Sequence, residues 1–311
     1  METISFLFSV SGERKPGEGE DSFVYSVNRS QALLGVFDGC GGSGAERYGK
    51  LQNKTGAYLA ARTASAAYRD WFEKLDPERE PDADELKSRL VRYLEFCQKQ
   101  AGESGGRIPG RTYKTLPTTA AVALFRPSSG RVADIRLQWA GDSRVYLLDG
   151  AGLAQLTEDD LGGQDAMECL YQERPLSNSV NLTREFTVHA ARLTMGRPGL
   201  LFAATDGCFR YLSTPMEFEY LLLHSLQSAA SPAAWEESLT REIGKVSRDD
   251  FTLVGAALGL AGFDDLKRQL AGRTSQVYRT YRNGLEACSE EEKQQLWDHY
   301  KNHYYRHLCR P

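Results

Sequence analysis

The sequence predicts an α+β fold in which antiparallel sheets carry helices on their outer faces. The apolar patterns follow one another as strands, helices, strands, helices and a last strand, without the strict alternation that parallel sheets require. Two short apolar runs, 32–37 and 199–204, lack any polar alternation and are typical of strands buried on both faces. The stretch 263–311 is charged, aromatic and helical in pattern, with no strand signal. We therefore expect a mixed domain over 1–260 and a helical extension over 261–311.

The first half of the chain predicts three strands followed by two helices. Ser43 and Glu46 have the spacing of a capping box, which predicts that a long helix begins there and ends near Leu75. The second helix has an apolar stripe on one side. Residues 102–117, rich in Gly, Arg and Pro, favour an exposed loop. The strands are expected at 4–10, 22–27 and 32–37, and the second helix at 84–100.

The second half predicts mainly strands and then two helices before the last strand. Ser231 is a good N-cap, and Pro232 suits the first position of the helix that follows. The segment 158–181 has no clear period. Strands are expected at 118–125, 132–140, 144–148, 153–156, 186–193, 199–205 and 251–258, and helices at 216–228 and 232–246.

Composition excludes several classes of function. The net charge of −4 argues against nucleic acid as the main partner, because a nucleic-acid-binding protein needs a basic face. No apolar run approaches the length of a membrane span, and the N-terminus lacks the features of a signal peptide. The six cysteines are scattered without CxxC spacing, which favours neither a zinc site nor a disulfide framework. We expect a cytoplasmic protein.

Two acidic residues end the two buried runs in the same way. Asp38 and Asp206 each follow an apolar strand and precede a glycine. A carboxylate in so poorly solvated a place is costly unless a cation meets it, and glycine lets a ligand approach the backbone. An Asp-Gly pair alone is typical of a turn. Two pairs after matching strands indicate a shared cation cluster about as strongly as they indicate two turns.

Further acidic residues lie at the ends of other predicted strands. Carboxylate and carbonyl oxygens are hard donors that suit Mg²⁺ or Mn²⁺, and no histidine lies nearby to favour zinc. With two cations roughly 3.5–4 Å apart, such a cluster can activate water and hold phosphate oxygens. The alternative, that these acids are solvated turn residues, stays equally open on spacing alone. The acidic positions are Glu20, Asp21, Asp38, Asp142, Asp206, Asp249 and Asp250.

Seven short motifs together resemble, in their order and spacing, the type 2C metal-dependent serine/threonine protein phosphatases. The resemblance extends over roughly residues 4–260. It implies a four-layer α-β-β-α sandwich of two antiparallel sheets, with a dinuclear metal site in the cleft between them. The phosphatase domain would then occupy 1–260, followed by the helical extension. The motifs are Gly19-Glu20-Asp21-Ser22, Val36-Phe37-Asp38-Gly39-Cys40-Gly41-Gly42, Thr119-Ala120-Ala121-Val122, Ala140-Gly141-Asp142-Ser143-Arg144, Leu156-Thr157-Glu158-Asp159-Asp160, Ala204-Thr205-Asp206-Gly207 and Ser247-Arg248-Asp249-Asp250-Phe251-Thr252.

The resemblance also implies a role for each matching residue. Asp38 would bridge two ions, Mn²⁺ or Mg²⁺, and Asp206 and Asp249 would complete the shell of one of them. Glu20 and the carbonyl of Gly39 would serve the other ion. The implied reaction is direct attack of water on phosphorus, without a phosphorylated enzyme, and the implied partners are phosphoproteins and a cognate serine/threonine kinase.

The remaining acids would support this centre. Asp142, together with Asp206, matches a third and weaker metal site of the family. Asp21 and Asp250 would lie behind the direct ligands. No membrane partner is expected.

Two positions depart from the family pattern. Cys40 stands where many members carry a histidine, and we expect it to serve packing or spacing. Pro16 stands where many carry a phosphate-binding arginine, so Arg14 or Lys15 is the candidate to hold the phosphate. These departures keep one alternative open, a catalytically weak phosphatase fold that binds or regulates a partner. A second alternative, a phosphatase for small molecules, is not excluded by the sequence.

The C-terminal extension has two patterns of its own. Its histidines at 299, 303 and 307 are spaced along one helix face, which suits a transition-metal site or, more commonly, a packed face. Its leucines and tyrosines predict an amphipathic surface that docks on the catalytic domain or recruits a partner.

Overall fold

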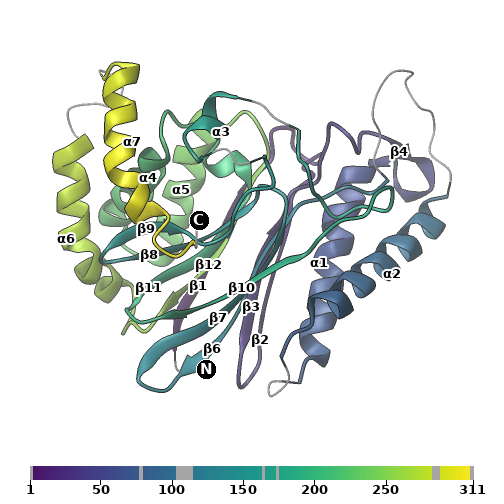
Figure 1. Cartoon of the computed structure of the whole chain (residues 1–311), viewed down its shortest axis with the longest axis horizontal. Coiled ribbons are helices and arrows are strands. Elements are labelled where there is room, and N and C mark those ends of the chain that lie inside the picture. Colours follow the sequence, from purple (N-terminus) through teal and green to yellow (C-terminus); the bar gives the residue numbers. More distant parts are fainter. Residues whose placement is uncertain are drawn as a thin grey trace.

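The chain folds into two five-stranded sheets packed face to face with helices on both outer sides (Figure 1). This computed structural model describes residues 3–76, 80–102, 115–162, 165–172, 175–281 and 288–308. Every paired strand in the two sheets is antiparallel. The predicted α+β class and the four-layer sandwich are therefore confirmed.

The inner faces of the two sheets form the central core. Leu34 and Val36 of one sheet belong to the same buried cluster as Leu201 and Ala203 of the other. The first sheet has the order β1 (Ile4–Gly12), β12 (Phe251–Leu258), β11 (Gly199–Ala204), β8 (Arg144–Asp149) and β9 (Gly152–Gln155). The second has the order β10 (His189–Met195), β7 (Arg131–Ala140), β6 (Ala120–Ser128), β3 (Ala32–Phe37) and β2 (Ser22–Val27).

The helices cover the two outer faces separately, as Figure 1 shows. The second sheet is covered by α1 (Gly56–Lys74) and α2 (Ala83–Ala101). The first sheet is covered by α4 (Pro215–Ser228), α5 (Pro232–Val246), α6 (Phe263–Tyr281) and α7 (Glu290–Tyr304). A short helix, α3 (Glu168–Tyr171), lies in the segment without a readable period. No helix in the part of the chain that the structure describes is long and apolar enough to cross a membrane.

Local chemistry sets several boundaries where the sequence predicts them. The Oγ of Ser231 accepts a hydrogen bond from the amide of Ala234 at 3.2 Å, so α5 begins at Pro232 as expected. The strand β12 is buried along its whole length and has the predicted bounds. The strand β10 begins at His189, later than expected. Most of the loop expected at 102–117 lies outside the described residues.

The prediction that α1 begins after Ser43 is wrong. The residues before α1 form a small hairpin of β4 (Arg47–Tyr48) and β5 (Lys54–Thr55), with a 3₁₀ turn (η1, Gly49–Leu51) between them. Gln52 and Asn53 adopt left-handed backbone angles, with φ of 55° and 58°, which a continuous helix cannot contain. The helix starts only at Gly56, where Thr55 accepts a hydrogen bond from the amide of Tyr58.

The C-terminal helices share one hydrophobic core with the first sheet. Leu266 and Leu270 of α6 and Trp297 and Tyr304 of α7 are buried in the cluster that also contains Phe202 of β11. The extension thus docks on the same chain, as one of the two expectations had it.

The histidine stripe of the extension is not a ready metal site. His307 lies beyond the end of α7, and Nε2 of His303 is 2.8 Å from the guanidinium of Arg306. Nδ1 of His299 is 2.7 Å from a backbone carbonyl of its own helix. The stripe is therefore a partly packed surface with polar contacts to neighbouring groups.

Candidate active site

A cavity of about 990 Å³ opens at the strand ends where most of the predicted acids lie. Asp38 follows β3, Asp142 lies between β7 and β8, and Asp206 follows β11, so the two sheets supply residues to one site. Of the predicted site residues, only Asp21 and Lys15 are not part of the described lining. The others, Arg14, Glu20, Asp38, Gly39, Asp142, Asp206, Asp249 and Asp250, all line it.

The backbone around Asp38 is held by the two threonines that precede β6 (Thr118 and Thr119). The amide of Asp38 donates to Oγ1 of Thr119 at 3.1 Å, and its carbonyl accepts from the amide of Thr119 and the hydroxyl of Thr118, both at 2.8 Å. Two residues after Asp38, the amide of Cys40 donates to the carbonyl of Pro117 at 3.1 Å. In an antiparallel bridge this pattern turns the carbonyl of Gly39 away from Thr118. Gly39 itself lines the cavity.

Two glycines after Asp38 make room for the chain and for Glu20. A Cβ on Gly39 would lie 2.6 Å from the carbonyl oxygen of Ala57, which is backbone and cannot move aside. A Cβ on Gly41 would lie 2.2 Å from a carboxylate oxygen of Glu20. Glycine at these positions therefore lets Glu20 lie directly over the loop that follows Asp38.

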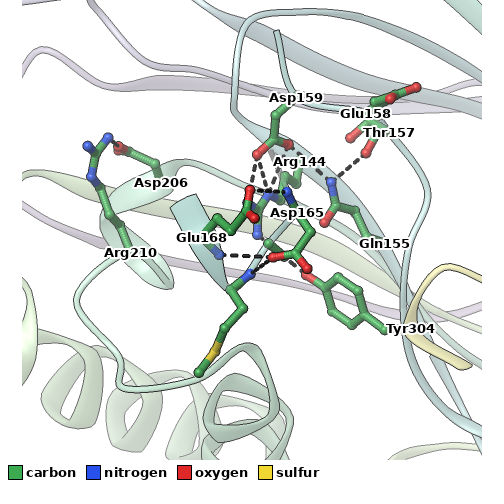
Figure 2. Close-up of polar contacts among 12 residues, drawn as sticks. Arg144, Gln155, Thr157, Glu158, Asp159, Asp165, Glu168, Asp206, Arg210 and Tyr304 are labelled. Atoms are coloured by element: carbon green, nitrogen blue, oxygen red, sulfur yellow. Dashed lines mark hydrogen bonds and ion pairs between the residues drawn. The ribbon is translucent and has the colours of Figure 1, made fainter. Parts of the chain in front are cut away.

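The acids on the other wall are tied to protein donors. The hydroxyl of Thr55 donates to Glu20. The carboxylate of Asp250 accepts from the amides of Arg14 and Glu20, at 2.8 and 2.7 Å, and so joins the loop before β12 to the loop before β2. Asp206 forms an ion pair with Arg210 at 3.1 Å (Figure 2). Asp249 accepts from the amide of Asp250 at 2.9 Å.

The acids of this site raise one another's pKa values. Burial raises the pKa of Asp38 well above its ordinary value, and the charges of Asp21 and Asp206 raise it further. Burial and then the charge of Asp206 raise the pKa of Asp142 to about 8. Burial raises the pKa of Asp21 to about 8, although Thr205 donates to its carboxylate at 2.8 Å. Bound cations would displace these protons and offset the repulsion between the carboxylates.

The donors of this cavity fit Mn²⁺ or Mg²⁺ in chemical type and in charge. The candidate ligands are carboxylates and one carbonyl, which are the hard oxygen donors that these ions prefer. Within the described ranges, no three Asp, Glu, His or Cys side chains lie close enough together to hold an ion as they stand. Asp206 hydrogen-bonds to Arg210 and Glu20 to Thr55, and we expect both carboxylates to turn toward an ion that binds here.

Metal-free protein is expected to lose stability as the pH rises from about 4 to about 8. In that window the unfolded chain has released the protons of Asp21 and Asp142, whose ordinary pKa is 3.8, whereas the folded chain keeps them up to about pH 8. The loss should level off above that pH. Thermal unfolding in chelator across this range measures it, and Asp21→Asn should flatten the slope. A slope of the opposite sign, or one unchanged by Asp21→Asn, would contradict the account.

Several cavity residues escaped the sequence analysis. Arg210 lies one helical turn after Asp206, and the i,i+4 spacing of opposite charges is the signal that would have found it. Arg184 lies between the segment without a clear period and β10, and no local pattern marks it. Thr119, whose hydroxyl accepts a hydrogen bond from the amide of Asp38, belongs to one of the family motifs, but the sequence assigned it no role of its own. Tyr211 also lines the cavity.

Comparisons with known proteins agree with this fold. The family described as protein phosphatase 2C matches residues 13–243. A solved bacterial serine phosphatase is 18% identical, with a TM-score of 0.59, over 81% of this chain and 96% of its own. The serine/threonine phosphatase Stp1 from Staphylococcus aureus is 16% identical, with a TM-score of 0.56, over 81% and 93%. No curated protein sequence matches.

A third similar solved structure is also a serine/threonine phosphatase. The PPM Ser-Thr phosphatase MsPP from Mycobacterium smegmatis, in complex with cacodylate, is 14% identical, with a TM-score of 0.56, over 83% of this chain and all of its own. The chain belongs to the protein phosphatase 2C family. It is a metal-dependent protein serine/threonine phosphatase.

Proposed function

We propose that this cavity hydrolyses phosphoserine and phosphothreonine directly, without a phosphorylated enzyme. The observation that carries the proposal is the gathering of Asp38, Asp142, Asp206 and Glu20 on one cavity, with the pKa of each of Asp38, Asp142 and Glu20 raised. Two divalent ions, Mn²⁺ or Mg²⁺, would lower the pKa of water and neutralise the phosphate when bound there.

Apart from one shared residue, different residues would hold the two ions. Asp38, central among the acids, would contact both, with Asp206 and Asp249 on one side and Glu20 and the carbonyl of Gly39 on the other. The pairing of Asp206 with Asp249 is supported by the pKa of Asp249, which burial raises and the charge of Asp206 raises further. Asp142, with its charge next to that of Asp206, would serve a third and weaker site. Asp21 and Asp250 would act from behind, because they hold Thr205 and the loop at Glu20.

A protein substrate suits the surface better than a small metabolite does. A second cavity of about 400 Å³ adjoins the first and shares Arg14, Glu20, Asp249 and Asp250 with it. Basic side chains such as Lys54 line it. A substrate larger than its phosphate would therefore find a continuous surface beyond the acids.

The phosphate is expected to be held by arginines that line the main cavity. Arg184→Met should raise KM for a phosphopeptide about tenfold, because a charged hydrogen bond to phosphate contributes about 1.5–3 kcal/mol. Arg14→Met should act in the same direction. Lys15 is 74% exposed, lines only the second cavity and lies 4.0 Å from Glu18, so Lys15→Met should change KM less than twofold. Steady-state kinetics on one peptide would rank the three, and a largest effect at Lys15 would contradict the assignment.

A substrate panel tests the proposed function. The purified chain should hydrolyse phosphoserine and phosphothreonine peptides and an aryl phosphate with Mn²⁺ or Mg²⁺, and should be inactive in chelator. Faster turnover of sugar phosphates or nucleotides than of peptides would favour the small-molecule alternative. No turnover of any substrate with either metal would favour the binding module. Cys40 lines the cavity, at the position where many members of the family carry a histidine.

The cellular role follows from the substrate class. We propose that the enzyme reverses the action of a serine/threonine kinase in the same cell and so takes part in signalling. One relative in fold is PppA, a key regulatory component of T6SS in Pseudomonas aeruginosa. A cytoplasmic location is proposed from the five described cysteines, all of which are free thiols.

A further inference from the structure

The turn that carries Asp142 is held from both sides by consecutive acids. The amide of Gly141 donates to the carboxylate of Asp160 at 2.8 Å, and the amide of Asp160 donates back to the carbonyl of Gly141 at 3.1 Å. On the other side, Arg144 donates to Asp159 through Nε and Nη2, with a shortest distance of 2.6 Å. Because Asp142 lies between these two anchors, its carboxylate depends on both.

The buried Arg144 reaches further, to the C-terminal helix. Its Nη1 donates to the hydroxyl of Tyr146 at 3.2 Å and to that of Tyr304, on α7, at 3.4 Å. The hydroxyl of Tyr304 also donates to that of Tyr146 at 3.3 Å. Figure 2 shows Asp159 on one side of Arg144 and Tyr304 on the other. A residue beyond the family match of 13–243 thus completes the hydrogen bonding of a guanidinium beside the active site.

The same helix also fixes the segment that follows Asp159 and Asp160. The indole of Trp297 donates to Asp165 at 2.9 Å, and the hydroxyl of Tyr305 accepts from the amide of Ala166 at 2.6 Å. Both ends of the stretch from Asp159 to Ala166 are therefore tied to α7, directly or through Arg144.

We propose that α7 is a positioning element of the active site, in which Tyr304 holds Arg144 and Asp159 and thereby the turn of Asp142. The inference rests on the proposed function for its effect on turnover. Its effect on the backbone does not depend on any activity.

The structure offers a matched control on the same helix. Tyr300 is also buried, one turn earlier, and its hydroxyl donates to Glu219 at 2.6 Å. Glu219 in turn accepts from the amide of Leu153, on β9. Tyr300→Phe and Tyr304→Phe each remove one hydroxyl from α7, but only Tyr304 is connected to the turn of Asp142.

Two measurements on the full-length chain test the proposal. Tyr304→Phe should lower kcat/KM for a phosphopeptide about fivefold, mainly in kcat, because an unpaired buried donor loosens Arg144. Tyr300→Phe should stay within twofold of the unmodified enzyme. In metal-free protein, hydrogen exchange should quicken at Gly141 and Asp160 in Tyr304→Phe, and at Leu153 in Tyr300→Phe.

The outcomes separate this proposal from the proposed function. Equal exchange at Gly141 and Asp160 in the two variants would overturn the role of Tyr304, even if the enzyme is active. Equal losses of kcat/KM in Tyr304→Phe and Tyr300→Phe would mean that α7 only stabilises the fold in general, which would also overturn the proposal. If the unmodified chain hydrolyses nothing, the proposed function fails, whereas the exchange comparison still decides whether Tyr304 positions the turn.

Discussion

Asp38→Asn is expected to lower kcat by about three orders of magnitude while making the metal-free protein more stable. Asparagine has the shape of the acid but lacks the charge that would attract two cations, so the stabilisation of the reacting phosphate is lost. The same charge is a burden without metal, because burial and the neighbouring acids raise the pKa of Asp38 well above its ordinary value. At pH 8 in chelator the variant should therefore unfold at a higher temperature.

The opposite signs of these two effects make the test specific. Adding Mn²⁺ should raise the unfolding temperature of the unmodified chain much more than that of Asp38→Asn, because a ligand stabilises the state that binds it. Asp134→Asn is a suitable control, since Asp134 lies on β7 and accepts a hydrogen bond from Thr194, apart from the cavity lining. A variant that is both inactive and less stable in chelator would point to simple misfolding.

Arg273→Met is expected to reduce the free energy of unfolding by about 3 kcal/mol or more. The side chain of Glu219 is 0% exposed, and Arg273 of α6 forms an ion pair with it at 2.6 Å and a second hydrogen bond at 2.7 Å. Removing the arginine leaves a buried carboxylate with only uncharged donors among its described contacts, the hydroxyl of Tyr300 and the amide of Leu153. Breaking one side of a buried pair typically costs about 3–5 kcal/mol.

Urea unfolding of matched variants measures this cost. Arg268, on the same helix, is 69% exposed and pairs with Asp265 at 3.2 Å, so Arg268→Met should cost less than about 0.5 kcal/mol. Adding Glu219→Gln to Arg273→Met should recover part of the loss, because the uncompensated charge is gone. Similar losses for the two arginines would mean that α6 is not an integral part of the folded domain.

The sequence predicted those parts of the fold in which local pattern and tertiary structure agree. α5 has the expected bounds because its N-cap serine and first-turn proline mark its start locally. β12 has them because it is mainly apolar and is buried along its whole length. The hairpin before α1 was missed because Ser43 and Glu46 imitate a helix start. Gln52 and Asn53 adopt left-handed backbone angles although neither is a glycine, so the sequence contained no signal for this turn.

The acids of the cavity lie at one end or the other of recognisable strands, which by itself indicated a shared site no more strongly than solvated turns, and the family resemblance decided between the two. The sequence did not predict which residues, distant along the chain, line the cavity beside these acids or position them. Arg184 lines the cavity without any local signal, and Tyr304 reaches Arg144 across a separation of 160 positions. A period in the sequence predicts that a tyrosine faces inward, but it does not predict which buried charge the hydroxyl will meet.

Anomalous diffraction from crystals grown with Mn²⁺ tests the central claim most directly. The account predicts two strong peaks roughly 3.5–4 Å apart beside Asp38, with Asp206 released from Arg210 and Glu20 released from Thr55. Peaks elsewhere, or no peak while Asp206 remains paired with Arg210, would contradict it.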